Sequence, residues 1–85
     1  MKVEYDHEAD AAYIRLSDAP IGRTEEESDV CILDFNSEGC LVAIELLSVF
    51  GFAGASLHGL ARRGLLSRQD VDQVLKELRS ELVAA

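Results

Sequence analysis

The sequence contains no tryptophan, a single proline and only two cysteines among its 85 residues. Two cysteines are too few for the disulfide framework that stabilises many small secreted domains. The cysteines and histidines also lack the paired spacing of a zinc site. Because a domain of this length buries only about 60–65% of its unfolded surface, a partner subunit becomes the expected source of extra stability. We therefore expect a homo-oligomer, most simply a dimer, and no cofactor.

Long apolar runs are absent as well. The longest uncharged stretch, residues 46–61, is interrupted by glycines and is too short to span a bilayer. The first residues alternate charged and apolar side chains and do not resemble a signal peptide. Hydrophobic residues make up 48% of the chain and charged residues 28%, which is typical of a folded globular domain. These features predict a soluble, cytoplasmic single domain over residues 1–85, without membrane contact.

Positive charge is scarce in the first part of the chain. The formal net charge is −8, and residues 1–50 hold 12 acidic residues against 3 basic ones. Such a surface repels phosphates, so nucleic acid is not an expected partner. Negative charge keeps small proteins soluble, and it also suits a basic protein partner. The acidic surface that could bind this partner comprises Glu25, Glu26, Glu27 and Asp29.

What the sequence does contain is a succession of short β patterns. Val3 and Tyr5 alternate with charged residues in a first strand, and residues 11–17 alternate in a second. A loop around Pro20 follows, because proline lacks an N–H for strand pairing. Residues 23–28 suggest an edge strand, whose glutamates would discourage association with another sheet.

The clearest hairpin joins residues 30–35 to residues 40–47 through a turn that ends in Gly39. If Phe35 pairs with Cys40, seven apolar side chains fall on one face, and a slip of one residue would destroy that segregation. They are Cys31, Leu33, Phe35, Cys40, Val42, Ile44 and Leu46. The two cysteines would then lie about 13 Å apart, too far for a disulfide, and both are expected to be buried as small hydrophobic residues.

Two helices are expected after the sheet. A glycine-rich segment predicts a short helix over residues 55–63, with Ser56 near its start and Gly64 at its C-cap. Ser67, with Asp70 three residues later, resembles a capping box at the start of a longer amphipathic helix. The apolar stripe of that helix is Val71, Val74, Leu75, Leu78 and Leu82. We expect this stripe to face the core, with docking onto a partner or a second copy as the alternative.

A basic cluster lies between the two helices and consists of Arg62, Arg63 and Arg68. Solvated arginines at a helix end complement the helix dipole, which is the favoured interpretation. The alternative is contact with an acidic partner or with the glutamate-rich strand of a second copy.

Three carboxylates alternate across the first turn, Asp6, Glu8 and Asp10, and this pattern could hold calcium or magnesium. The spacing departs from a calcium-binding loop, because Ala11 stands where the bend needs glycine and Ser17 where a bidentate glutamate belongs. A turn in which aspartate accepts backbone N–H groups is favoured. No nucleophile–base pair or phosphate-binding glycine loop is present, so neither catalytic residues nor a metal are expected. A metal-dependent enzyme or hydrolase using these carboxylates is kept as the alternative.

The first hairpin carries a motif of alternating tyrosines and acidic residues. It reads Tyr5-Asp6-x-Glu8-Ala9-Asp10-Ala11-x-Tyr13-Ile14-Arg15-Leu16-Ser17, and it is followed by Ile32-Leu33-Asp34-Phe35 and Val42-Ala43-Ile44-Glu45-Leu46. The combination resembles the DUF2283 (YuzE-like) family of small bacterial and archaeal proteins over about residues 1–48. The resemblance implies a small antiparallel sheet with a helical addition. Residues 51–85, where the residue patterns predict helices, extend beyond the part of the chain that the resemblance covers. It assigns no role to the motif residues Tyr5, Asp6, Glu8, Asp10, Tyr13 and Glu45.

The resemblance also implies an antitoxin-like or accessory role, because similar proteins are encoded beside small toxins of the RNase type. Together with the residue patterns, it predicts an α+β fold with about five antiparallel strands, a short helix and a longer C-terminal helix. The expected function is a non-catalytic interaction module for a small basic protein. A self-associating structural module is a further alternative.

Overall fold

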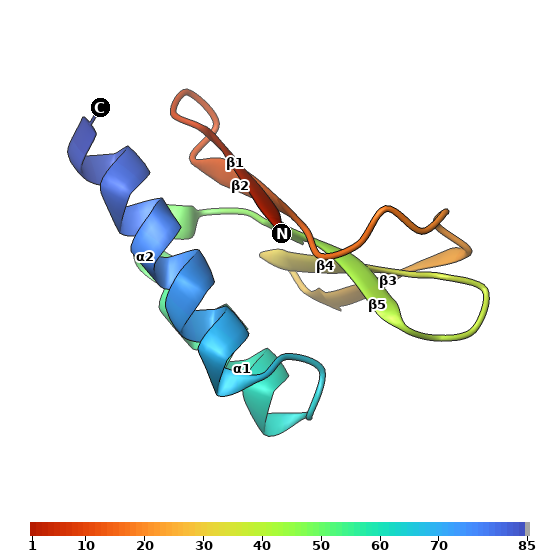
Figure 1. Ribbon diagram of the computed structural model, residues 1–85. Coiled ribbons are helices and arrows are strands. Elements are labelled where there is room, and N and C mark those ends of the chain that lie inside the picture. The colour runs from red at the N-terminus through yellow and green to blue at the C-terminus, as the bar shows by residue number, and fades with distance from the viewer. Residues whose placement is uncertain (85) are drawn as a thin grey trace.

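The computed structural model describes residues 1–84 and contains five β-strands followed by two α-helices (Figure 1). The strands are β1 (Lys2–Asp6), β2 (Ala11–Arg15), β3 (Arg23–Ser28), β4 (Cys31–Phe35) and β5 (Leu41–Leu46). The helices are α1 (Val49–Arg62) and α2 (Arg68–Ala84). The predicted α+β architecture, with five strands and a longer C-terminal helix, is confirmed.

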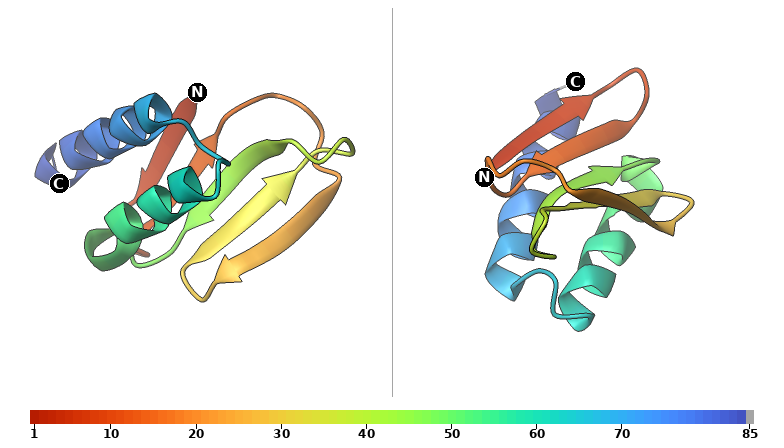
Figure 2. Two further views of the ribbon diagram at one scale, coloured as in Figure 1. Left: turned by 90° about the horizontal axis from the view of Figure 1, so that it is seen from below. Right: turned by 90° about the vertical axis from the view of Figure 1, so that its right-hand side faces the viewer.

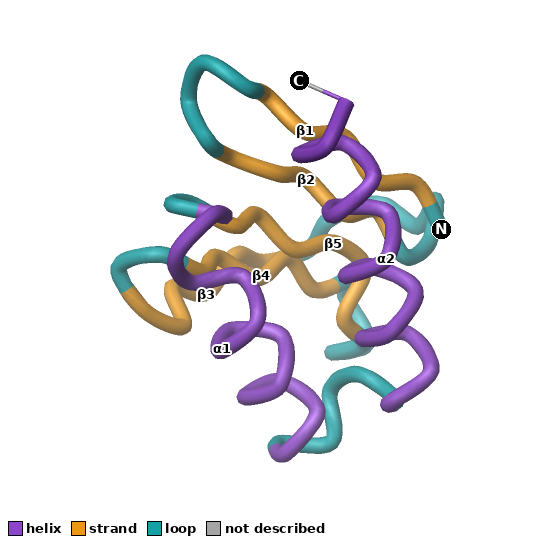
Figure 3. The backbone as a smooth tube through the Cα atoms, turned by 90° about the vertical axis from the view of Figure 1, so that its left-hand side faces the viewer, coloured by secondary structure: helices purple, strands orange, loops and turns teal. Residues whose placement is uncertain are grey.

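The sheet is antiparallel throughout, with the strand order β1-β2-β5-β4-β3, so β1 and β3 are its two edges. Both helices lie on one face of the sheet (Figure 2). They run side by side and are joined by a short loop (Figure 3). The first helix packs against β5, whereas α2 packs against α1 and β1. Neither described helix is long and apolar enough to cross a membrane.

The core fills the space between the helices and the sheet. Its strand residues alternate along β2 and β4 with more exposed ones, as the period of two requires. The most completely buried side chains of this core include Ile14, Leu33, Ile44, Leu46, Leu57, Leu60, Val71, Val74 and Leu78. Within residues 1–84, the opposite face of the sheet is not covered by a helix.

The register of the β4–β5 hairpin differs from the predicted one by two residues. Leu33 pairs with Ile44, and Cys31 pairs with Leu46, so the same apolar face is kept. A β-bulge next to Phe35 places Leu41 opposite it and leaves Val42 as the extra residue. Six of the seven apolar residues predicted for this face are buried, all but Cys40, and the predicted pairing was wrong.

Cys40 accounts for one residue of this shift, because it belongs to the turn and not to the strand, and the bulge accounts for the other. The side-chain oxygen of Asn36 accepts hydrogen bonds from the amides of Glu38 and Cys40, both at 2.9 Å. The amide of Asn36 donates to the Cys40 carbonyl at 2.9 Å, which closes the loop one residue later than expected. Cys40 is consequently exposed, and its predicted burial is wrong. Cys31 is buried as predicted, and the two thiols form no disulfide.

The first helix begins at Val49, not at residue 55, and Ser56 lies inside it. The prediction placed the start too late because the glycines of this segment have poor helix propensity. Two features override that propensity. Four apolar residues are buried along one side of the helix, Val49, Ala53, Leu57 and Leu60. In addition, the amides of Val49 and Phe50 donate hydrogen bonds to Asp10, which is distant in the sequence.

The two helix ends next to the α1–α2 loop have the caps that the sequence predicts. Gly64 adopts a positive φ of 76°, and its amide donates to the Ala61 carbonyl at 3.0 Å. The amide of Leu65 donates to the Leu60 carbonyl at 3.0 Å, which completes a Schellman motif. At the start of α2, the Ser67 hydroxyl accepts a hydrogen bond from the amide of Asp70 at 3.0 Å. Both predicted caps are confirmed.

The apolar stripe of α2 faces the core. Val71, Val74 and Leu78 are at most 2% exposed, and Leu75 is half-buried against the same cluster. Leu82, near the end of the helix, is also half-buried. Docking of this stripe onto a partner would require its central side chains, Val71, Val74 and Leu78, to leave the core.

Candidate functional site

The signature turn between β1 and β2 is organised by its aspartates. The carboxylate of Asp6 accepts hydrogen bonds from the amides of Glu8 at 3.0 Å and Ala9 at 3.2 Å. This is the aspartate-supported turn that the sequence favours. The carboxylate of Asp6 therefore has a local structural role.

Asp10 connects this turn to the first helix. Its backbone has a positive φ of 50°, and its carbonyl accepts the amide of Val49 at 3.0 Å. Its two carboxylate oxygens lie 3.2 and 3.1 Å from the amide nitrogen of Phe50. A carboxylate in this place both accepts an unpaired helix amide and complements the positive end of the helix dipole. Asp10 thus acts as a cap for α1 from a position 40 residues away in the chain.

Tyr5 supports the same carboxylate from β1. Its hydroxyl donates a hydrogen bond to Asp10 Oδ1 at 2.6 Å. This bond, followed by partial burial and by the charges of Asp10 and Asp6, raises the pKa of Tyr5 to about 12. The phenol therefore stays protonated at neutral pH and remains a donor to Asp10.

These contacts bear on the predicted metal alternative. Asp6 and Asp10 direct their carboxylates to backbone amides and to the Tyr5 hydroxyl, while Glu8 is exposed. Among the described residues, no group of three or more histidine, cysteine, aspartate or glutamate side chains is placed to hold a metal ion. The structure thus assigns the two aspartates to the scaffold.

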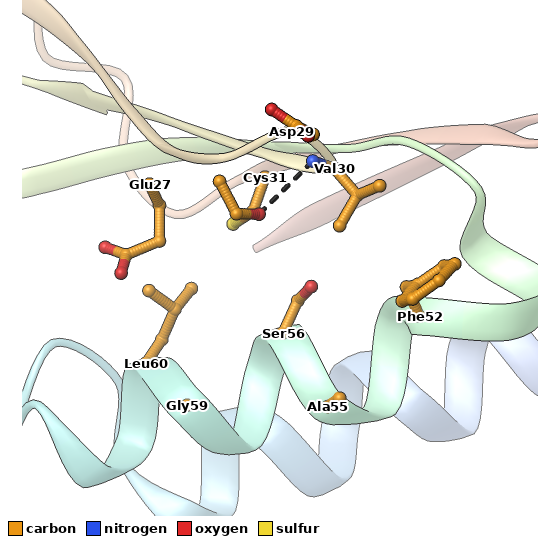
Figure 4. A pocket seen from close by; sticks show the side chains of 10 residues that line it. Glu27, Asp29, Val30, Cys31, Phe52, Ala55, Ser56, Gly59 and Leu60 are labelled. Carbon is orange, nitrogen blue, oxygen red and sulfur yellow. Dashed lines mark hydrogen bonds between the residues drawn. The ribbon is translucent and has the colours of Figure 1, made fainter.

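A concavity lies on the helix-bearing face of the sheet, at its β3 end, between α1 and the β3–β4 turn (Figure 4). It has a volume of about 540 Å³. One wall is the turn from Glu27 to Cys31, and the other is α1 with Phe52, Ser56 and Leu60. In Figure 4 the side chains of Leu60 and Ser56 point from the helix toward the strands, and Glu27 points toward the helix.

The groove combines an apolar interior with an acidic margin. Phe52 is 52% exposed at one end, and its neighbour Phe50 on the same helix is 84% exposed. Glu27 and Asp29 stand on the strand side. Glu27 forms an ion pair with Arg63, so the contact considered for a second copy is made within one chain. Asp29 has no ion-pair partner in the part of the chain that the structure describes.

Comparison with protein-family models identifies one family. A model described as a protein of unknown function (DUF2283) matches residues 2–49. The chain belongs to the DUF2283 family. Comparisons with curated proteins and with solved structures gave no significant match.

The DUF2283 match covers the whole sheet and ends at the first residue of α1. It therefore includes Asp10 and Tyr5, which hold the start of that helix, but not the helical wall of the groove. In this chain the signature turn connects the sheet to the start of α1. The groove joins a strand turn inside the match to a helix that lies outside it.

The remaining motif residues lie on the sheet face without helices. The hydroxyl of Tyr13 accepts a hydrogen bond from Arg15 at 3.3 Å and donates one to Asp34 at 3.4 Å. Thr24 donates to the other oxygen of Asp34 at 2.7 Å, and Glu45 is the strand partner of Tyr13. This network crosses from β2 to β3 and pairs polar groups of the open face with one another. Side-chain contacts of this kind between strands stabilise a sheet.

The four predicted acidic residues do not form one surface. Glu25 pairs with Leu33 and lies on the helix side of β3, whereas Glu26 pairs with Ile32 and lies on the open side. Only Glu27 and Asp29 reach the groove. Sequence reasoning missed Phe52 because it began the helix at residue 55; an exposed aromatic pair two residues apart, Phe50 and Phe52, was the available signal.

Proposed function

We propose that this DUF2283 protein is a non-catalytic interaction module that binds a basic, amphipathic segment of another protein in the groove between α1 and the β3–β4 turn. The observation that carries the proposal is the groove itself, with Phe52 exposed at one end and Glu27 and Asp29 among the residues of the strand wall. Large apolar side chains that are half-exposed in a concave site are typical of recognition surfaces.

The charges favour a basic partner. Asp29 is exposed and the chain carries a formal net charge of −8, so a cationic segment is attracted and an anionic one is repelled. Glu27 is neutralised by Arg63, which an incoming lysine or arginine can replace as the partner of this carboxylate. The apolar side chains of the segment then cover Phe52 and Val30.

A pair of synthetic peptides tests this function. Both are amphipathic helices with the same leucine positions, but one carries lysine and the other glutamate on its polar face. Binding is followed by the amide chemical shifts of the isotopically labelled protein. We expect the lysine peptide to shift Asp29, Phe52 and Ser56, and the glutamate peptide to leave them unchanged.

Two variants sharpen the result. Phe52→Ala is expected to weaken binding of the lysine peptide by about tenfold, because an aromatic anchor commonly supplies 1 kcal/mol or more. Ile21→Ala is the matched control, since Ile21 is 46% exposed but does not line the groove. Equal binding of both peptides, or shifts away from the groove, would contradict the proposed function.

A further inference from the structure

The two edges of the sheet are built differently. β3 carries consecutive glutamates and a break in register between Glu26 and Ser28, and both features discourage pairing with another strand. β1 pairs with β2 over all five of its residues without a shift in register. Its sequence, Lys2 to Asp6, contains neither proline nor a run of like charges. β1 is therefore the edge that lacks these safeguards.

The hydrogen-bond pattern shows which backbone groups of β1 point outward. The amide of Leu16, the residue after β2, donates to the carbonyl of Val42 in β5 at 2.8 Å. Because bonding direction alternates along an antiparallel strand, Tyr13 directs its backbone groups toward β1, where it pairs with Glu4. The backbone groups of Val3 and Tyr5 then point away from the sheet. They are available to a further strand.

The charges of β1 are self-complementary in one register. When two antiparallel copies are centred on Val3, Lys2 of each copy lies opposite Glu4 of the other, and the two Val3 side chains face each other. Centring on Glu4 instead places the two Glu4 carboxylates opposite each other, which is destabilising. Centring on Tyr5 places Glu4 of each copy opposite Asp6 of the other, so two carboxylates again face each other. The Val3 register alone avoids opposed like charges.

We propose that β1 pairs with β1 of a second copy of this chain in the Val3-centred register, forming one continuous sheet of two subunits. Val3 donates to and accepts from its counterpart across the twofold axis, and two Lys2–Glu4 pairs flank it. The twofold axis stands perpendicular to the sheet, so the helices of both copies cover the same face. Met1, which is 51% exposed in one copy, lies opposite the second copy's Tyr5 and becomes less exposed to solvent.

A charge exchange tests both the surface and the register. Lys2 and Glu4 have side chains that are 75% and 65% exposed, so their substitution leaves the core intact. Sedimentation of the wild-type protein is expected to show a reversible dimer. Lys2→Glu and Glu4→Lys are each expected to weaken it by about tenfold or more, because two attractive cross-strand pairs become repulsive. The double variant restores the attraction and should dimerise like the wild type.

Glu26→Lys is the matched control, because it changes the charge of the other edge by the same amount and should not alter dimerisation. A monomeric wild type at all concentrations overturns the proposal. A dimer that survives Lys2→Glu, or that is lost in Glu26→Lys, also overturns it. Failure of the double variant to dimerise overturns the Val3-centred register and would point to the Glu4-centred one, in which the exchanged charges repel. The groove lies away from β1, so this proposal and the proposed function can fail separately.

Discussion

The two ends of the sheet are held in different ways. At the β1–β2 end, Asp10 binds the start of α1 and accepts a hydrogen bond from Tyr5. In addition, α2 packs against β1, and His7 lies 3.7 Å from Glu81 of α2. At the β3 end, the contacts with the helices include one ion pair, between Glu27 and Arg63. The signature residues therefore build the scaffold, whereas the groove lies where the helices leave the sheet less covered.

The largest effect is expected from removing the connection at the β1–β2 end. Asp10→Ala loses the acceptor of Tyr5 and Phe50 and places alanine in a left-handed conformation. We expect a loss of about 3 kcal/mol in the free energy of unfolding, since hydrogen bonds to charged groups contribute roughly 1.5–3 kcal/mol and the conformation adds about 1 kcal/mol. Urea denaturation measures it.

Two further variants show whether the loss of stability comes from the contacts of Asp10. Asp10→Asn tolerates the left-handed conformation and keeps one acceptor oxygen, so it should be destabilised by less. Asp18→Ala, at an exposed position in the loop before β3, should change stability by no more than about 0.5 kcal/mol. If Asp10→Ala is no worse than Asp18→Ala, the two ends of the sheet are not held differently.

A smaller effect is expected at the β3 end. The side chains of Glu27 and Arg63 are 29% and 46% exposed, so Glu27→Gln should cost less than about 1 kcal/mol. Glu26→Gln, on the opposite face of the same strand, is the control and should be close to neutral. Thermal unfolding of the three proteins measures the comparison. A loss as large as that of Asp10→Ala would show that the ion pair holds β3 as firmly as Asp10 holds α1.

The smallest effect near neutral pH concerns the ionisation of Tyr5. Its pKa is about 12 in the folded protein and about 10 when unfolded, because the hydrogen bond to Asp10 favours the neutral phenol. A raised folded pKa gives stability that is fully present below pH 10 and is lost as the pH rises toward 12. Tyr5→Phe should lack this decline. Titration of phenolate absorbance should assign the higher transition to Tyr5; a single transition near pH 10 in the wild type would contradict it.

Much of this fold follows from local sequence patterns. Alternation in β1 and β2, the period of the α2 stripe and the capping residues Ser67 and Gly64 each specify a structure within a few neighbouring residues. The predictions were wrong where a side-chain contact or a contact with a distant residue determines the local structure. Asn36 draws Cys40 into the turn, and Asp10 supplies acceptors for the start of α1. Neither contact can be deduced from periodicity.

The candidate site was predictable only in part. Glu27 and Asp29 were recognised as acidic, but their separation from Glu25 and Glu26 depends on strand pairing and on the bulge in β3. The apolar wall was missed, because Phe52 becomes part of a surface only when α1 starts at Val49. The motif around Asp10 marked the family correctly, while its scaffold role required the geometry of the helix start.

Amide hydrogen exchange at the two edge strands tests most directly the claim that β1 pairs with a second copy and β3 does not. By the alternation that exposes Val3 and Tyr5 on β1, the amides of Thr24 and Glu26 point outward from β3. Pairing of β1 between two copies should slow exchange at Val3 and Tyr5 as the protein concentration rises, while Thr24 and Glu26 stay fast at every concentration. Equally fast exchange at all four amides, independent of concentration, would contradict the account.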